Sequence, residues 1–290
     1  MSTHVEKNPS YRPVWVGVAV LATLAGAACA YAALAPRQRF RTVAGSAGSL
    51  VIDDGGEGDV PVLFVHSFAG STAHWNAQLT HLRRNRRAVA MDLRGNGMSD
   101  PPRDNDYAMT ALADDIAAVA DGLELDRFVL VGHSMGGDAA AAYTAQHPER
   151  VAGLLLVGTP AKASDDLAQQ VMSSLDADYD SVMNDYWETL LKGARPVAHA
   201  SLSKAMRKVR HEASKAMIAA TFAYDPVPAL TSYPGPVHLI DTVHTDGPAS
   251  LHLQARHVPR DLVTGTSHWP QLDEPDEFNQ LLDGFLQLVK

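Results

Sequence analysis

The sequence predicts an α/β fold with a doubly wound, mostly parallel sheet covered by helices on both faces. Short apolar runs alternate with segments of helical periodicity, which is the pattern of a parallel sheet. One run, Val129–Val131, ends at a glycine-flanked serine and is followed at once by an alanine-rich segment. The alternation breaks once, over residues 161–224, where helix-like segments predict a helical cap inserted between core residues 48–160 and 225–290.

Composition narrows the class of protein. The 290 residues are 46% apolar and 20% charged, as in an ordinary globular protein, and their number suffices for one large domain or two small ones. A net charge of −9 argues against nucleic acid as a partner. The single cysteine, Cys29, excludes an intrachain disulfide, and a lone thiol is poor material for a metal site.

The N-terminal segment predicts a membrane partner. Residues 1–12 form a polar tail, and residues 13–36 are expected to be a membrane anchor or signal segment that forms an apolar helix. Residues 14–35 carry no charge, and about 20 apolar residues suffice to cross a bilayer. We expect a single-pass N-terminal anchor and membrane localisation; the alternative is export after cleavage near the small residues Ala28, Ala30 and Ala32. Residues 37–47 are expected to be a linker.

Each strand of the core is predicted by a short apolar run between turn residues. Residues 61–66 are continuously apolar up to His66, as expected for a strand buried on both faces, and the glycine-rich residues 54–59 before them predict a turn. In chain order, strands are expected at residues 49–53, 61–66, 87–92, 127–131, 151–157, 237–240 and 260–263.

The helices are predicted by apolar residues at helical spacing, as at Leu112, Ile116 and Val119. In the core, helices are expected at residues 72–83, 107–122, 138–146, 249–255 and 275–288. In the cap, they are expected at residues 165–175, 179–191, 197–209 and 212–222.

The segment Gly132-His133-Ser134-Met135-Gly136-Gly137 has the pattern of a nucleophile elbow. A sharp turn from strand to helix strains the backbone of the serine, and the flanking glycines avoid collisions with neighbouring backbone. The helix N-terminus then directs N–H groups to the place where negative charge develops in acyl transfer. Ser134 is the predicted nucleophile.

Four segments together resemble the α/β-hydrolase superfamily, over about residues 48–290. Residues 65–71 resemble its oxyanion loop, residues 91–100 its D-x-R-G-x-G-x-S loop, residues 132–137 its elbow, and residues 265–270, with the Glu274-Pro275 pair, its histidine segment. The chain thus resembles a serine-nucleophile, capped, esterase-like member of that superfamily.

The resemblance implies a Ser-His-Asp triad. A serine hydroxyl needs a base, and His268 stands in the chain order Ser, acid, His that this fold requires. The acid follows the strand at residues 237–240. Asp246 is preferred, Asp241 is the alternative, and an acid relocated to a position such as Asp165 is the third option.

The oxyanion hole needs two backbone N–H groups, and the resemblance assigns them to Phe68 and Met135. The family has His-Gly before Phe68, whereas this chain has His66-Ser67. Either the loop tolerates serine, or the Ser67 hydroxyl lines the site and orients substrate or water. His66, Ser67 and Trp269 are therefore candidates for the substrate pocket, although His66 is also consistent with a structural role.

These residues predict a serine hydrolase of the carboxylesterase type that acts on esters or related acyl substrates through an acyl-enzyme, without metal or cofactor. The same triad can also hydrolyse carbon–carbon bonds, lactones or thioesters, or carry out cofactor-free perhydrolysis. Epoxide and haloalkane hydrolysis are disfavoured, because those members of the family place Asp where this chain has Ser134. The alternatives outside catalysis are a hydrolase-like ligand receptor with little turnover and a membrane-tethered scaffold with a dead site.

Overall fold

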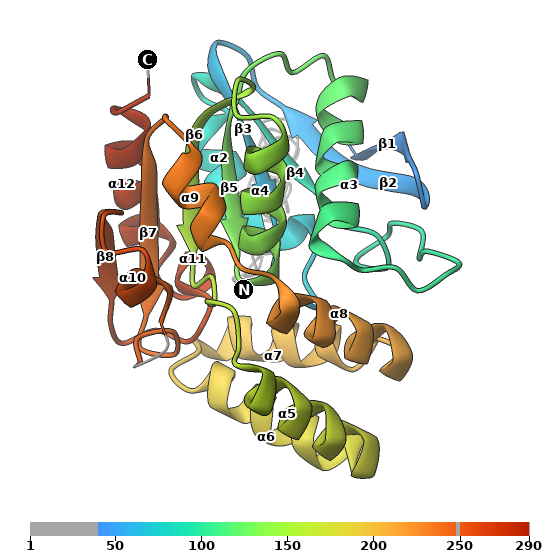
Figure 1. The fold of residues 1–290 in the computed structure, drawn as a ribbon. Coiled ribbons are helices and arrows are strands. Elements are labelled where there is room, and N and C mark those ends of the chain that lie inside the picture. The colour runs from blue at the N-terminus through green and yellow to red at the C-terminus, as the bar shows by residue number, and fades with distance from the viewer. Residues whose placement is uncertain (1–39, 248–249, 290) are drawn as a thin grey trace, which may run out of the picture. The chain divides into compact units, whose positions relative to one another are not determined.

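The computed structural model describes residues 40–247 and 250–289, and a single sheet forms its centre. The eight strands of this part of the chain follow the order β1-β2-β4-β3-β5-β6-β7-β8 (Figure 1). β2 pairs antiparallel with both β1 and β4, and every pair from β4–β3 to β7–β8 is parallel. The strands are β1 (Phe40–Gly45), β2 (Gly48–Gly55), β3 (Asp59–Val65), β4 (Arg86–Met91), β5 (Phe128–His133), β6 (Val151–Val157), β7 (Val237–Thr242) and β8 (Arg260–Val263).

Helices cover both faces of the sheet, as predicted. One apolar core lies between the sheet and α3 and α4, and a second lies between the sheet and α2 and α12 (Figure 1). The core helices are η1 (Thr72–Trp75), α2 (Asn76–Leu82), α3 (Met109–Gly122), α4 (Met135–Gln146), α9 (Val227–Ser232), α10 (Leu251–Gln254), α11 (Pro270–Asp273) and α12 (Pro275–Leu286).

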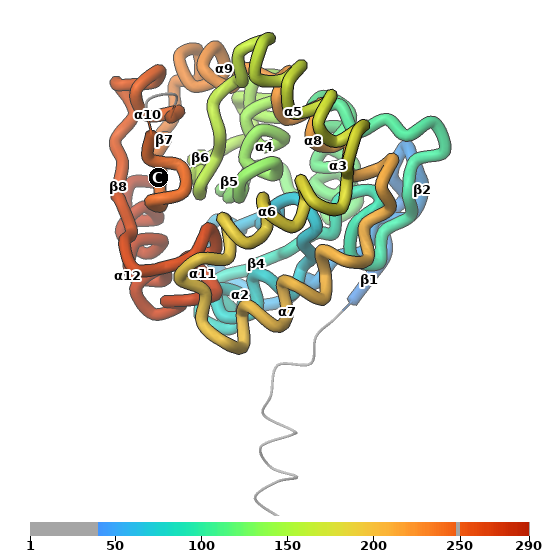
Figure 2. The backbone as a smooth tube through the Cα atoms, turned by 90° about the horizontal axis from the view of Figure 1, so that it is seen from below, coloured from blue at the N-terminus to red at the C-terminus, as the bar shows by residue number. Residues whose placement is uncertain are grey.

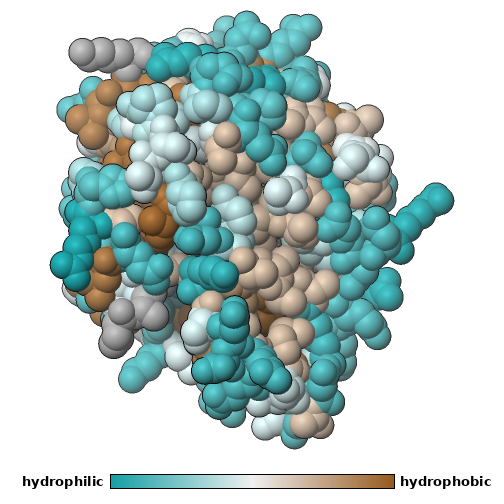
Figure 3. Space-filling model, viewed as in Figure 1, coloured by the Kyte–Doolittle hydropathy of each residue, from teal (hydrophilic) through white to brown (hydrophobic). Residues whose placement is uncertain are grey.

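The four predicted cap helices are confirmed. They are α5 (Asp165–Ala177), α6 (Tyr179–Leu191), α7 (Pro196–Met206) and α8 (His211–Ala223). Figure 2 shows them spread in front of the core in the view from below. Leu175, Met183 and Met217 of these helices are buried, whereas Leu167 and Val197 are exposed. Hydrophilic side chains are plentiful on the lower part of the face in Figure 3, where Figure 1 places the cap. The cap helices therefore turn their apolar sides inward.

The predicted linker, residues 37–47, contains strand β1. Thr42 and Val43 are β-branched and pair with β2, and Arg41 forms an ion pair with Asp54 at 3.0 Å. The predicted membrane segment, residues 13–36, with the apolar helix expected at its centre, lies outside the described residues. Within residues 40–247 and 250–289, no helix combines the length and the apolar character needed to span a bilayer.

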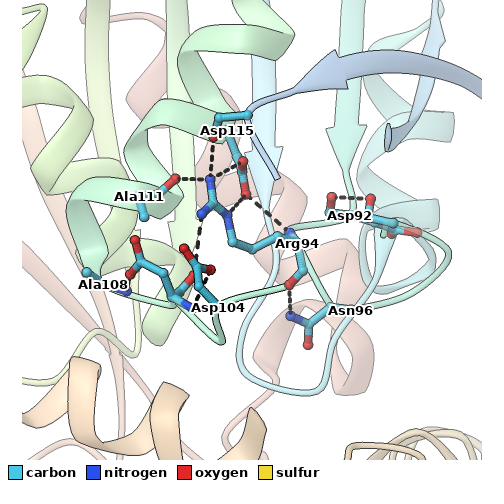
Figure 4. A network of polar contacts seen from close by, with 10 residues as sticks. Asp92, Arg94, Asn96, Asp104, Ala108, Ala111 and Asp115 are labelled. Atoms are coloured by element: carbon cyan, nitrogen blue, oxygen red, sulfur yellow. Dashed lines mark hydrogen bonds and ion pairs between the residues drawn. The ribbon is translucent and has the colours of Figure 1, made fainter. Parts of the chain in front are cut away.

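An arginine anchors the loop that follows β4. Arg94 donates Nε–H to Asp115 Oδ2 at 2.8 Å and Nη2–H to Asp115 Oδ1 at 2.7 Å (Figure 4). Nη2 also donates to the Ala111 carbonyl at 2.7 Å, and the Arg94 carbonyl accepts from the Asn96 amide at 3.0 Å. A bidentate, buried pair of this kind fixes the loop against α3.

The aspartate of the same motif holds the loop from the other side. Asp92 accepts the backbone N–H of Thr72 at 2.6 Å and of Met98 at 2.8 Å. Gly97 has φ of 56°, and a Cβ there would lie 2.1 Å from an Asp92 carboxylate oxygen. The motif residues Asp92, Arg94 and Gly97 thus have structural roles in this loop.

Candidate active site

The elbow places Ser134 at the carboxyl end of β5. Its backbone is strained, with φ 54° and ψ −122°, and its N–H donates to the Val157 carbonyl at 2.8 Å. A Cβ at Gly132 would lie 2.4 Å from the Gly136 carbonyl oxygen, and one at Gly136 would lie 2.3 Å from that of His66. The two flanking glycines are therefore required, as the sequence predicted.

Ser134 and both predicted oxyanion donors line one cavity of about 190 Å³. Met135 is the first residue of α4, so its N–H has no acceptor within the helix. Phe68 lies in the loop after β3, where the Gly70 N–H donates to the Ser67 carbonyl at 2.9 Å. The structure thus gathers Ser134, Met135 and Phe68 around one space.

The rest of the cavity is formed by the cap and is apolar, with Thr221 and the Tyr186 hydroxyl as polar exceptions. None of the described residues that line it is charged. The lining residues from α5, α6 and α8 are Val171, Leu175, Val182, Met183, Tyr186, Met217, Ile218, Thr221 and Phe222. The i, i+4 spacing of Val171 with Leu175 and of Val182 with Tyr186 is the signal in the sequence for the inner side of α5 and α6.

His268 lies in the loop after β8, against the end of β6. A Cβ on Gly158 would lie 3.0 Å from its Cε1, and the preceding residue, Val157, holds Ser134. The His268 N–H donates to the Leu190 carbonyl of α6 at 3.0 Å. Burial, with a smaller contribution from His244, lowers the pKa of His268 to about 3, so the ring is a neutral base. In the part of the chain that the structure describes, no hydrogen bond joins the Ser134 and His268 side chains.

His133, the residue before the predicted nucleophile, contacts the predicted base. His133 Nε2 lies 2.9 Å from the His268 carbonyl oxygen, and Nδ1 lies 3.0 Å from the Gln271 amide nitrogen. Because a carbonyl can only accept, Nε2 carries the proton and Nδ1 accepts from Gln271. Burial lowers the pKa of His133 well below its usual value and keeps this arrangement neutral.

The acid candidates contact an arginine, and neither contacts the base. Arg260 Nη1 lies 3.3 Å from Asp241 Oδ2 and 3.0 Å from Asp246 Oδ1. His268 Nδ1 is buried with no hydrogen-bond partner among the described residues. Burial raises the pKa of Asp241, which lies on β7. The third option, Asp165, begins α5 and is exposed.

The three pocket candidates are buried, and none is among the residues that line the cavity. His66 donates Nδ1–H to the Ser67 carbonyl at 2.7 Å and accepts the Leu93 N–H at Nε2, 3.0 Å away, which fixes its tautomer. Ser67 Oγ accepts the indole N–H of Trp269 at 3.0 Å. These bonds connect the loops around the site.

A second cavity, of about 440 Å³, lies in the cap between α6 and α7 and shares Met183 with the first. Its lining is polar in part and includes Glu188, His199 and Trp187. The Trp187 ring stacks on Phe68 with centroids 5.2 Å apart. No group of His, Cys, Asp and Glu in residues 40–247 and 250–289 is arranged to hold a metal ion.

Known proteins share this architecture. A family model described as alpha/beta hydrolase fold matches residues 60–190. A solved structure described as "Est816 as an N-Acyl homoserine lactone degrading enzyme" superposes with a TM-score of 0.73 and 28% identity, covering 84% of this chain and all of that one.

Among curated proteins, Epoxide hydrolase 3 of Xenopus tropicalis is 28% identical over 263 residues, which is 78% of this chain and 71% of that protein. The 2-hydroxymuconate semialdehyde hydrolase of Pseudomonas sp. (strain CF600) is 38% identical over 111 residues, or 37% of this chain and only 39% of that protein. The relatives thus differ in the bonds that their names say they cleave.

Proposed function

Because this chain belongs to the α/β-hydrolase superfamily, we propose that it is a serine hydrolase acting on carboxylic esters with an uncharged, apolar acyl group. The observation that carries the proposal is the strained Ser134, which opens with Phe68 and Met135 into one apolar cavity. Strain of this kind is stored at functional sites, and the two backbone donors suit a developing oxyanion.

The proposed reaction has two halves. Ser134 Oγ attacks the ester carbonyl carbon while His268 takes the hydroxyl proton, and the Phe68 and Met135 N–H groups bind the oxyanion. The protonated His268 then gives that proton to the leaving alcohol. Water, deprotonated by His268, attacks the carbonyl carbon of the acyl-enzyme; the bond to Ser134 Oγ breaks, His268 returns the proton to Oγ, and the acid is released.

Asp246 is proposed as the acid that orients His268. Its loop follows β7, and the Ile240 carbonyl near the end of β7 accepts the N–H of Gly158, which lies against His268. His244 of the same loop acts electrostatically on His268. To serve as the acid, Asp246 must leave Arg260 and accept a hydrogen bond from His268 Nδ1, which has no partner among the described residues.

The volume and the apolar lining of the cavity favour substrates with a medium-length, uncharged acyl group. A cavity of about 150 Å³ lined by apolar residues binds benzene, so about 190 Å³ suits an acyl group of roughly six to eight carbons. A substrate carboxylate would find no basic side chain among the lining residues. Acidic substrates, of the kind that the name 2-hydroxymuconate semialdehyde hydrolase indicates, are therefore disfavoured. Ser134 at the elbow disfavours epoxides, because the epoxide-hydrolysing members place Asp there.

Hydrolysis of acyl lactones is the second candidate. A lactone is a cyclic ester, and the structure described as an N-acyl homoserine lactone degrading enzyme is matched over its full length by 84% of this chain. The apolar cavity would accept the acyl chain of such a lactone as readily as that of an open ester.

The test is steady turnover by the full chain on p-nitrophenyl esters of increasing acyl length and on acyl lactones. We expect multiple turnovers, an optimum near roughly six to eight carbons, and loss of activity and of fluorophosphonate labelling in Ser134→Ala. Stoichiometric labelling without turnover would favour a receptor, and no labelling at all would favour a scaffold.

A further inference from the structure

The oxyanion loop and the histidine loop are joined by one buried hydrogen bond. Ser67 stands where the resemblance leads us to expect glycine, and it is 1% exposed. Its Oγ lies 3.0 Å from the indole nitrogen of Trp269, which is 202 positions away in the sequence. Because an indole N–H can only donate, the serine oxygen is the acceptor.

We propose that Ser67 is a positioning residue, whose hydroxyl fixes the distance between the oxyanion donor Phe68 and the base His268. Each partner of the bond is the chain neighbour of one of these groups. This inference rests on the proposed serine hydrolase function and adds a residue to it.

The indole of Trp269 is a rigid point of attachment. Its ring lies edge-on to His133, with centroids 5.9 Å apart, and edge-on to His268 at 5.1 Å. Its backbone N–H donates to Ser267 Oγ at 3.2 Å. A shift of the indole would therefore also shift the neighbouring His268. Ser67 connects the oxyanion loop to this indole.

The other contact of the Ser67 hydroxyl is weaker, since Oγ lies 3.5 Å from the Phe68 carbonyl oxygen. Glycine at position 67 would leave the Trp269 N–H buried with no acceptor from this loop. A second indole offers the matched comparison: Trp75 is equally buried, lies near His133, and its N–H has no partner among the described residues.

The experiment compares Ser67→Ala, Trp269→Phe, their double variant and the control Trp75→Phe in the full chain, with p-nitrophenyl hexanoate as substrate. Loss of an oxyanion donor costs about 10²- to 10³-fold in kcat, and a displaced donor should cost less. We expect each single variant to lose about 5- to 30-fold in kcat, with KM changed less than about 2-fold and the double variant no worse than the poorer single one. Trp75→Phe should keep wild-type kcat.

A second readout separates positioning from loss of fold. The affinity for a trifluoromethyl ketone, which forms an oxyanion on Ser134, should fall in proportion to kcat/KM in both single variants. Ser67→Gly should behave like Ser67→Ala. Retention of kcat within about 2-fold in Ser67→Ala, or losses that multiply in the double variant, would overturn the inference. A wild-type chain that neither turns over esters nor labels at Ser134 would instead overturn the proposed function itself.

Discussion

Two arginine–carboxylate clusters of this chain differ in how the arginine is used. The Arg94 side chain is 4% exposed and donates two hydrogen bonds to Asp115, from Nε at 2.8 Å and from Nη2 at 2.7 Å. Arg260 is 25% exposed and offers one nitrogen, Nη1, to both Asp241 and Asp246. The same nitrogen lies 2.6 Å from His252 Nδ1.

The difference separates a fixed contact from an exchangeable one. A buried bidentate pair fixes the geometry of its partners and binds them strongly. A shared, partly solvated ion pair contributes little to the free energy of folding. Asp115 therefore stays with Arg94 and holds the fold. Asp246 can leave Arg260 for a better partner, and His268 Nδ1 is buried without one in the described part of the chain.

The largest effect expected from this comparison is at Asp246. In Asp246→Asn, His268 loses the carboxylate that we propose orients it, and we expect kcat to fall by about 10³- to 10⁴-fold. Asp241→Asn should lose far less, and Arg260→Gln should retain kcat because it frees Asp246. Steady-state kinetics on one ester measures all three, and a greater loss in Asp241→Asn would assign the acid to that residue.

The next effect concerns stability. Arg94→Ala leaves the Asp115 carboxylate buried without its partner, so we expect a loss of about 3–5 kcal/mol in the free energy of unfolding. Urea denaturation measures it. Replacing both residues, as Arg94→Met with Asp115→Leu, should recover much of that loss. If Arg94→Ala is as stable as the wild type, the contrast between the two clusters is wrong.

Features with a local signal were predictable from the sequence. The elbow at Ser134 and the four cap helices follow from glycine placement and apolar spacing within short windows. Strand β1 was expected to be a linker because arginines dominate residues 37–41, yet an edge strand tolerates exposed charge.

Features that depend on side-chain direction were not predictable. The sequence places Asp241 and Asp246 five residues apart after one strand, and only the folded loop shows that both face Arg260. The bond between Ser67 and Trp269 joins two distant loops, so no window of sequence contains it. The same holds for the cavity, whose lining comes from three cap helices and two core loops.

The acid limb of the pH profile shows whether His268 already has a carboxylate partner. Burial lowers its pKa to about 3, and only the neutral ring is a base. The acid limb of kcat/KM, which reports the free enzyme, should therefore lie well below 6.5 and be unmoved by Asp246→Asn. His244→Gln should shift the limb upward slightly, because it removes the second cause. A wild-type limb above 6.5 that drops in Asp246→Asn would mean that the pair forms before substrate binds.

The smallest effect is expected at Asp138, whose carboxyl group contacts no arginine in the described part of the chain. It lies on α4, is 1% exposed, and neither oxygen has a hydrogen-bond partner among the described residues. Burial, and secondarily the charge of Asp225, raise its pKa well above the usual value. The folded chain thus keeps a proton that the unfolded chain releases, so this group's contribution to stability is greatest at acid pH and falls as pH rises.

Asp138→Asn removes that titration with little change in shape. Its free energy of unfolding should match the wild type at about pH 3.5, below the ordinary pKa of an aspartate, and exceed it by about 1–3 kcal/mol at about pH 9, where an ionised Asp138 would be buried unpaired. Urea denaturation at both pH values measures the difference. Asp225→Asn should shift stability in the same direction by less, since the Asp225 charge is the smaller cause. A difference between Asp138→Asn and wild type that is equal at both pH values would show that Asp138 has a partner in solution, and would place it with Asp115 as a satisfied structural carboxylate.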